Sequence, residues 1–217
     1  MLGHLEIDFM KKEDVEKLVS RTYDKVSMKN YAAFSTGNSL NVLKLAIKKI
    51  KKGSKVLDAG CNIGLPYPKF MVGQGFDVTG IDLSPKAIKA AKKNVPKARF
   101  RTMSMTDLRF NPGSFDMVYT MFAIFHVERS LIPKVIRNFK KVLKKDGILL
   151  IGYSGSGKKP KMEDFFGEKM YYANYTNKEL KEDLKNNGFV VLMSKTILTK
   201  HKKAHPEKQR FIIAMRN

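Results

Sequence analysis

The amino-acid sequence predicts an α/β protein, an α/β/α sandwich of three layers with a seven-stranded, mainly parallel sheet in the middle. Five short apolar runs alternate with helical patterns, and parallel strands of this kind need helical crossover connections. Two further apolar runs, 189–194 and 211–215, have no helical pattern between them, so we expect an antiparallel hairpin at one edge of the sheet. The length of 217 residues suits a single domain, 1–217.

The first 50 residues predict two helices. Residues 6–29 place apolar side chains at helical spacing. Residues 40–50 do the same, and Asn38 or Ser39 can cap the start of that helix. We expect residues 1–50 to form a helical lid on the domain.

Residues 51–155 carry the strand and helix alternation and should form a ligand-binding core. Ser84 followed by Pro85 predicts a helix start, because serine caps helices and proline is tolerated at the first helical position. A longer helix over 131–143 has apolar residues on one side and lysines on the other. Strands are expected at 55–59, 77–81, 99–103, 115–120 and 147–152.

Residues 156–217 should contribute an insertion, the last helix and the hairpin. Thr176 and Glu179 have the spacing of a capping box, which predicts a helix that ends at Gly188. The insertion before this helix is rich in phenylalanine and tyrosine. Its aromatic side chains either bind a flat ligand or form a small core of their own under a long loop.

Composition excludes several classes of protein. Apolar residues make up 43% of the chain, too many for global disorder, and the single cysteine, Cys61, has no partner for a disulfide. Acidic residues interrupt the amino terminus and no apolar stretch could span a bilayer, so we expect a cytoplasmic protein without a membrane segment. The formal charge of +22 allows a nucleic-acid partner, but the lysines are spread along the chain and equally fit a solvated surface.

A glycine-containing turn, GCNIG at 60–64, directly follows Asp58 at the end of the first expected strand. Gly60 and Gly64 let a ligand approach the backbone, and Asp82 at the end of the next strand can accept hydrogen bonds from ribose hydroxyls. Together these residues predict a nucleoside site. The alternative is that both aspartates only cap helices.

With these residues in place, the chain resembles the class I S-adenosylmethionine-dependent methyltransferases. The run VLDAGCNIG at 56–64 is similar to the family pattern V-L-D-x-G-C-G-x-G. Further matching segments follow in the family's order: GIDLS, DLRFNPGSFDMVYT, FKKVLKKDGILLI and YTNKELKEDLKNNGF. The resemblance implies S-adenosyl-L-methionine as cofactor, S-adenosyl-L-homocysteine as product and a Rossmann-like fold that ends in an antiparallel hairpin.

The resemblance also implies roles for single residues. Asp58 and the Gly60 backbone would hold the methionine part of the cofactor, Asp82 the ribose hydroxyls, and Leu83 the adenine ring. The full set of implied cofactor contacts is Tyr23, Tyr31, Asp58, Gly60, Cys61, Asn62, Gly64, Asp82, Leu83, Ser104, Met105, Asp107, Thr120 and Met121.

Two positions depart from the family pattern. Asn62 stands where the family has its second loop glycine, although asparagine tolerates a left-handed backbone better than most residues. Ser104 stands where many relatives have an aspartate at the adenine edge, and Asp107 is then a candidate substitute.

His126 follows the fourth strand, where the family's acceptor faces the methyl group. Its near-neutral pKa would suit a general base, whereas a packed histidine is the plain alternative. The implied acceptor-side residues are Phe125, His126, Tyr153, Phe166, Tyr171 and Tyr172. We expect no metal cofactor.

The segment TMFAIFHV after the fourth strand lacks the features of three nucleic-acid subclasses of the family. It has neither the Asn/Asp-Pro-Pro-aromatic run of amino-methylating enzymes nor the cysteine nucleophile of cytosine-C5 enzymes, and no aspartate ends the strand as in 2'-O-methylating enzymes. The sequence therefore favours a methyltransferase that acts on a small-molecule acceptor. The alternatives are an RNA methyltransferase, acting on tRNA or rRNA, and a protein that binds the cofactor without turnover.

Overall fold

The structure, a computed structural model, describes residues 10–26, 37–154, 157, 159–199 and 207–217. Its strands are β1 (Lys55–Ala59), β2 (Asp77–Asp82), β3 (Arg99–Thr102), β4 (Phe115–Met121), β5 (Leu143–Ser154), β6 (Lys161–Phe165), β7 (Glu168–Tyr172), β8 (Phe189–Thr199) and β9 (Glu207–Arg216). Its helices are α1 (Lys12–Lys25), α3 (Gly37–Ile47), α4 (Tyr67–Gly73), α5 (Pro85–Asn94), α6 (Ile132–Val142) and α7 (Asn177–Asn186). Two short 3₁₀ turns, Ile124–His126 and Arg129–Leu131, connect β4 to α6.

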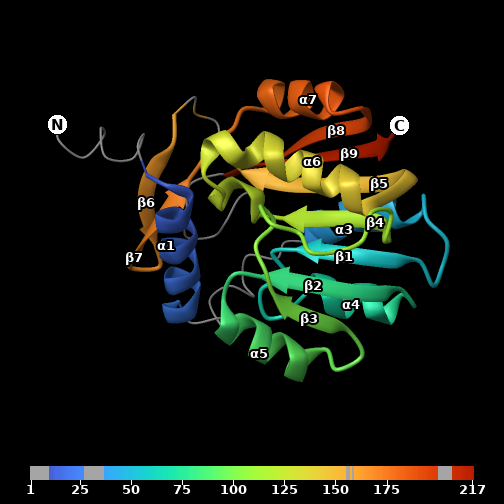
Figure 1. Cartoon of the computed structure of the whole chain (residues 1–217), viewed down its shortest axis with the longest axis horizontal. Helices are drawn as coiled ribbons and strands as arrows, with labels where there is room; N and C mark the ends of the chain where they lie inside the picture. The colour runs from blue at the N-terminus through green and yellow to red at the C-terminus, as the bar shows by residue number, and fades with distance from the viewer. Residues whose placement is uncertain (1–9, 27–36, 155–156, 158, 200–206) are drawn as a thin grey trace.

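The central sheet has seven strands in the order β3-β2-β1-β4-β5-β9-β8 (Figure 1). Every neighbouring pair from β3 to β5 is parallel, and β9 is antiparallel to both β5 and β8. The predicted fold class and the predicted hairpin at the sheet edge are thus confirmed. The strand order changes direction at β1 and β4, the place where parallel α/β sheets bind ligands.

Each face of the sheet has its own apolar core, because successive residues of a strand point to opposite faces. Leu57 and Val118 belong to the core beneath α6 and α7, whereas Val56 and Met117 belong to the core that α3 and α4 cover. All four side chains are fully buried. The inner strands β1 and β4 are therefore buried along most of their length, as expected for strands covered on both faces.

Two helix starts agree with their sequence signals. The Ser84 hydroxyl accepts a hydrogen bond from the Ala87 backbone N–H at 2.9 Å, ahead of Pro85. The capping box at α7 is complete, since the Thr176 N–H donates to Glu179 Oε2 at 2.8 Å and the Glu179 N–H donates to Thr176 Oγ1 at 3.2 Å.

Two helix boundaries differ from the expected ones. The helix expected over 6–29 is described only from Met10 to Val26, and there it begins at Lys12. The second helix is described from Gly37 onward, and Asn38 and Ser39 lie inside it, so neither is its cap. Ser39 is fully buried and accepts a hydrogen bond from the Tyr67 hydroxyl at 2.9 Å, which explains a polar residue at this position.

The aromatic insertion forms a second, two-stranded sheet from β6 and β7, which the sequence pattern does not predict. The two strands join through Phe166 and Gly167, which have φ values of 57° and 86°. Two consecutive residues with positive φ are typical of a tight hairpin turn. Glycine accepts this conformation readily, but phenylalanine at the first position gives no turn signal.

Helix α1 and the β6–β7 hairpin lie beyond the carboxyl ends of the parallel strands (Figure 1). The Thr22 hydroxyl of α1 donates to the Lys169 carbonyl of β7 at 2.9 Å and joins the two elements. Together they cover the end of the sheet at which its ligand site is expected. No helix in the described ranges is long and apolar enough to cross a membrane.

Candidate functional site

A pocket opens at the carboxyl ends of the parallel strands, beneath α1. The space within it, including open solvent at the mouth, is about 600 Å³. The loops after β1, β2, β3 and β4 all reach it. The lining residues are Glu16, Val19, Tyr23, Gly60, Asn62, Ile81, Asp82, Leu83, Met103, Ser104, Met105, Phe122, Ala123, His126 and Val127.

Gly60 allows the loop after β1 to approach the loop after β4. Its φ is +92°, and a Cβ atom at this position would lie 2.2 Å from the Cβ of Ala123. The Gly60 N–H donates to the Ile81 carbonyl at 2.8 Å, which fixes the loop against the end of β2. A side chain at position 60 would therefore be both strained and too close to its neighbour.

Asp82 holds the two loops that border the pocket. Its carboxylate accepts hydrogen bonds from the Asn62 N–H at 2.8 Å and from the Ser84 N–H at 3.0 Å. Burial raises the pKa of Asp82, and these backbone N–H groups offset part of that effect. The side chain is half-buried and lines the pocket.

Asn62 adopts the left-handed backbone that a glycine would supply at this point of the loop, with φ of 47°. Its Oδ1 accepts a hydrogen bond from the Ile63 N–H at 2.7 Å. The side chain is thus tied to its own loop while the residue still lines the pocket. The departure from the glycine pattern leaves the loop conformation intact.

Asp58 lies outside the residues that line the pocket and is only 1% exposed. Among the described residues, neither carboxylate oxygen of Asp58 has a well-formed hydrogen bond. Burial raises the pKa of Asp58 well above its ordinary value; the Tyr119 hydroxyl lowers it, and the charge of Asp82 raises it further. A buried acid in this state needs a polar partner.

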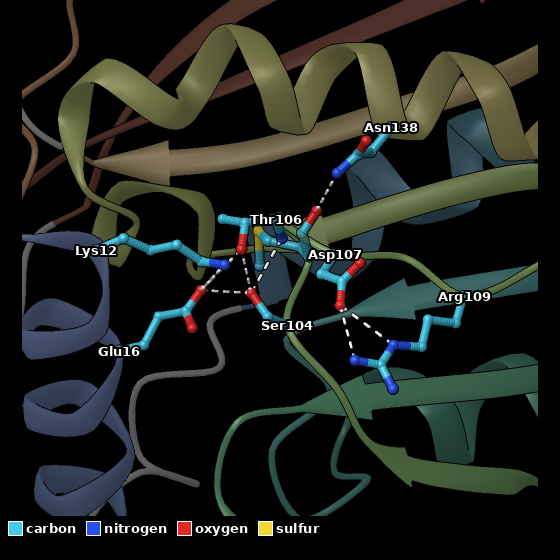
Figure 2. A network of polar contacts seen from close by, with 8 residues as sticks. Lys12, Glu16, Ser104, Thr106, Asp107, Arg109 and Asn138 are labelled. Atoms are coloured by element: carbon cyan, nitrogen blue, oxygen red, sulfur yellow. Dashed lines mark hydrogen bonds and ion pairs between the residues drawn. The ribbon is translucent and has the colours of Figure 1, made fainter.

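At the loop after β3, the acidic residue of the pocket differs from the one that the sequence predicts. Ser104 and Met105 line the pocket, as expected, but Asp107 does not. The Asp107 carboxylate accepts a hydrogen bond from Arg109 at 3.0 Å on the exposed surface (Figure 2). Glu16 of α1 supplies a carboxylate here instead, and it accepts a hydrogen bond from the Ser104 hydroxyl at 2.6 Å.

His126 lies on the wall of the pocket at the end of the first 3₁₀ turn. Its Nδ1 is 2.8 Å from the Tyr171 carbonyl oxygen, and its ring centroid is 4.9 Å from that of Tyr172 and 5.8 Å from that of Tyr23. Burial lowers the pKa of His126 to about 4. The imidazole is therefore neutral at physiological pH, and the carbonyl selects the tautomer with the proton on Nδ1.

Of the six expected acceptor-side residues, only His126 lines the pocket. Phe125 and Tyr171 are buried behind it, and Tyr172 stacks on Phe125 with ring centroids 5.7 Å apart. Tyr153 is buried and its hydroxyl donates to Asn177 at 3.0 Å, whereas Phe166 is 39% exposed at the tip of the β6–β7 turn. These aromatic residues thus support the wall of the pocket from behind or lie apart from it.

Of the remaining expected cofactor residues, some line the pocket and others do not. Tyr23 and Leu83 line the pocket, whereas Cys61, Gly64, Thr120 and Met121 do not. Cys61, Thr120 and Met121 are buried, and Tyr31 lies outside the described residues. In the described part of the chain, no group of three or more His, Cys, Asp or Glu side chains could hold a metal ion.

Sequence reasoning missed about half of the lining. The missed residues are Glu16, Val19, Ile81, Met103, Phe122, Ala123 and Val127. Ile81 and Met103 are the last residues of two predicted strands and could have been found by that position alone. Glu16 and Val19 come from a helix more than 35 residues before the glycine turn, and no local pattern connects them to it.

Comparison with known proteins agrees with this geometry. Residues 57–151 match the family model described as a methyltransferase domain. An uncharacterized methyltransferase of Synechocystis is 35% identical over 129 residues, which cover 56% of this chain and 60% of that protein. Phosphoethanolamine N-methyltransferase 1 of Arabidopsis thaliana is 34% identical over 167 residues, which cover 71% of this chain and 33% of that protein. The chain thus spans 60% and 33% of the lengths of these two relatives.

A similar solved structure is that of the 1,6-didemethyltoxoflavin-N1-methyltransferase of Burkholderia thailandensis, with bound 1,6-didemethyltoxoflavin and S-adenosylhomocysteine. It superposes with a TM-score of 0.77 over 96% of this chain and 91% of that chain, at 17% identity. A likeness at this level of identity shows a shared fold.

Proposed function

The chain contains a methyltransferase domain with the fold of the class I S-adenosylmethionine-dependent enzymes, and from this premise we infer that it transfers a methyl group from that cofactor to a small molecule. The observation that carries the proposal is the pocket at the carboxyl ends of β1 to β4, where Gly60 and Asp82 meet. In parallel α/β sheets this is the place where nucleoside ligands bind.

The residues present fit the cofactor. The buried Asp58 carboxylate lacks a well-formed hydrogen bond among the described residues, and the methionine amino group of the cofactor is a suitable partner. Gly60 has no side chain, which lets the loop after β1 lie against Ala123 of the loop after β4 at the pocket. Asp82 and Leu83 both line the pocket, and we propose that Asp82 accepts hydrogen bonds from the ribose hydroxyls and that Leu83 packs on the adenine ring.

When bound, S-adenosylmethionine supplies both the methyl group and its own leaving group. This chain then has to hold the two reactants in line, exclude water and, for some acceptors, remove a proton. His126 suits the last task, because its Nδ1–H donates to the Tyr171 carbonyl and its Nε2 is left with a lone pair. The imidazole is neutral near physiological pH, but burial lowers the pKa of His126 to about 4, so it is a weaker base than the near-neutral pKa expected from the sequence would give.

A small-molecule acceptor is favoured by the pocket itself. Most of its lining is apolar, with few polar groups, which is typical of small-molecule sites. Phosphoethanolamine N-methyltransferase 1 and the toxoflavin-type enzyme are named for small acceptors. The net charge of +22 remains the argument for RNA, and RNA is therefore included in the test.

The first experiment is calorimetric titration of the purified protein with S-adenosylhomocysteine. We expect binding with a dissociation constant in the micromolar range, and an absence of binding would contradict the proposed function. Labelled S-adenosylmethionine is then incubated with pools of small amines, phenols and carboxylates and, separately, with total tRNA and rRNA. Label transferred only to RNA would overturn the acceptor class, and label transferred to no acceptor would favour a protein that binds without turnover.

Replacement of His126 tests its role as a base. In His126→Gln we expect turnover of a proton-losing acceptor to fall about 100-fold or more, because general base catalysis typically contributes that much. The affinity for S-adenosylhomocysteine should change little, and this is measured on the same sample by calorimetry. Equal losses of affinity and turnover would instead indicate that His126 only packs the wall.

Buried, neutral His126 also makes stability depend on pH. Its pKa of about 4 in the folded protein lies below the value of about 6.5 in the unfolded chain, so only the unfolded state takes up the proton between these values. This contribution to stability is fully present above pH 6.5 and is lost as the pH falls towards 4, by about 3 kcal/mol in all. Urea unfolding at pH 7 and pH 4.5 should show a larger loss for the wild type than for His126→Gln, and equal losses would refute the assignment.

A further inference from the structure

Helix α1 carries three polar side chains, Glu16, Ser20 and Asp24, spaced four residues apart on one face. All three contact the loops that follow β2 and β3. The Ser20 hydroxyl donates to the Leu83 carbonyl at 3.1 Å, and the Ser84 hydroxyl donates to Asp24. The polar face of α1 therefore lies along the two loops that would hold the ribose and the adenine ring.

Glu16 is the member of this set that also lines the pocket. Its Oε1 accepts hydrogen bonds from the hydroxyls of Ser104 at 2.6 Å and Thr106 at 2.8 Å. The second oxygen, Oε2, accepts no hydrogen bond from the part of the chain that the structure describes (Figure 2). The Glu16 side chain is 25% exposed, so it is partly withdrawn from water while one oxygen stays available.

The two hydroxyls fix the direction of this carboxylate. Because Ser104 and Thr106 both donate to the same oxygen, the Glu16 side chain is held in one orientation at the end of β3. Ser104 also accepts a hydrogen bond from the Thr106 N–H at 3.0 Å, which ties the arrangement to the loop backbone. An anionic acceptor in a fixed place selects a ligand group that can donate hydrogen bonds.

We propose that Glu16 is a specificity-determining residue that accepts a hydrogen bond from the exocyclic amino group of adenine, so that helix α1 recognises the base. The proposal rests on the proposed function, in which the adenine ring packs on Leu83, and Glu16, Ser104 and Met105 line the same pocket. Asp107, the acid that sequence spacing offered for this task, faces Arg109 outside the pocket. The ligand class is a 6-aminopurine nucleoside, in preference to a 6-oxopurine, whose carbonyl oxygen is a hydrogen-bond acceptor with partial negative charge and would face another acceptor.

The test combines two ligands with two proteins. S-adenosylhomocysteine and its deaminated analogue S-inosylhomocysteine, which has a carbonyl in place of the amino group, are titrated into the wild type and Glu16→Gln. We expect the wild type to prefer S-adenosylhomocysteine by about 100-fold, the size of effect of one charge-assisted hydrogen bond gained and one repulsion avoided. The glutamine amide can donate to the carbonyl and still accept from Ser104, so the variant should bind both ligands within a few-fold of each other.

Asp14→Asn is the matched control, because Asp14 is exposed on the same helix and its replacement removes the same charge. This variant should keep the wild-type preference. A purely structural role of Glu16 would weaken both ligands equally and leave their ratio unchanged, which would overturn the inference, as would equal binding of both ligands to the wild type. Failure of the wild type to bind S-adenosylhomocysteine at all would overturn the proposed function and the inference with it.

Discussion

Asp82→Ala is expected to weaken the binding of S-adenosylhomocysteine at least about 100-fold. The carboxylate holds the Asn62 and Ser84 N–H groups in place, and in the proposed complex it also accepts hydrogen bonds from the ribose hydroxyls. Each hydrogen bond to a charged group contributes about 1.5 to 3 kcal/mol, so the loss of two such bonds to the ligand gives a factor of 100 or more. Calorimetric titration measures the change directly.

Asp77→Ala is the control for this experiment. Asp77 lies at the opposite end of the same strand, β2, where it forms an exposed ion pair with Arg99. Its replacement removes an equal charge from the same strand, but far from the pocket lining, and cofactor affinity should stay unchanged. Full affinity in a folded Asp82→Ala protein, verified by circular dichroism, would show that the ribose assignment is mistaken.

Gly60→Ala should destabilise the protein by about 3 kcal/mol and remove detectable cofactor binding. Positive φ costs an L-residue about 1 to 2 kcal/mol, and overpacking of a tight contact typically costs a further 1 to 3 kcal/mol. The contact in question is the 2.2 Å approach of the added Cβ to the Cβ of Ala123. Either Ala123 and the loop after β4 are displaced, or the loop after β1 is, and both border the pocket. Urea unfolding measures the stability of the variant, and calorimetric titration measures its affinity for S-adenosylhomocysteine.

Gly75 provides a matched reference for the backbone part of this effect. Its φ is +85°, close to that of Gly60, but no atom lies within 4 Å of the Cβ that alanine would add. Gly75→Ala should therefore cost about 1 kcal/mol and leave binding intact. Adding Ala123→Gly to Gly60→Ala should restore the packing part of the loss and leave the backbone part. Equal destabilisation by the two glycine substitutions would contradict the close approach.

The sequence contained enough information for the sheet and for one half of the site. Strand β1 has the predicted bounds, and the loops after β1 and β2 are recognisable because glycine and aspartate stand directly at strand ends. The resemblance to methyltransferases is confirmed by the domain match over 57–151. Each of these signals lies within a short segment of the chain, so it can be recognised from the sequence without knowledge of tertiary contacts.

The other half of the site depends on contacts between segments that are distant in the sequence. Glu16 and Ser104 form a hydrogen bond although they are 88 residues apart in the sequence, and no local pattern near either residue predicts this contact. The β6–β7 hairpin was missed for a related reason, since Phe166 occupies a left-handed turn position that its residue type does not favour. Ser39 is of a residue type that often caps helices. Its hydrogen bond from the Tyr67 hydroxyl joins residues 28 positions apart, so the local sequence does not predict it.

The place of β9 in the sheet has a consequence for biosynthesis. Because β9 lies between β5 and β8, the earlier-made β8 has no neighbour in the sheet until β9 has left the ribosome. During that interval the edge of β5, with Leu149, Leu150 and Ile151, offers unpaired backbone groups beside apolar side chains. Such an edge is a site for intermolecular strand pairing, so we expect the nascent chain to be open to aggregation between the synthesis of β5 and that of β9.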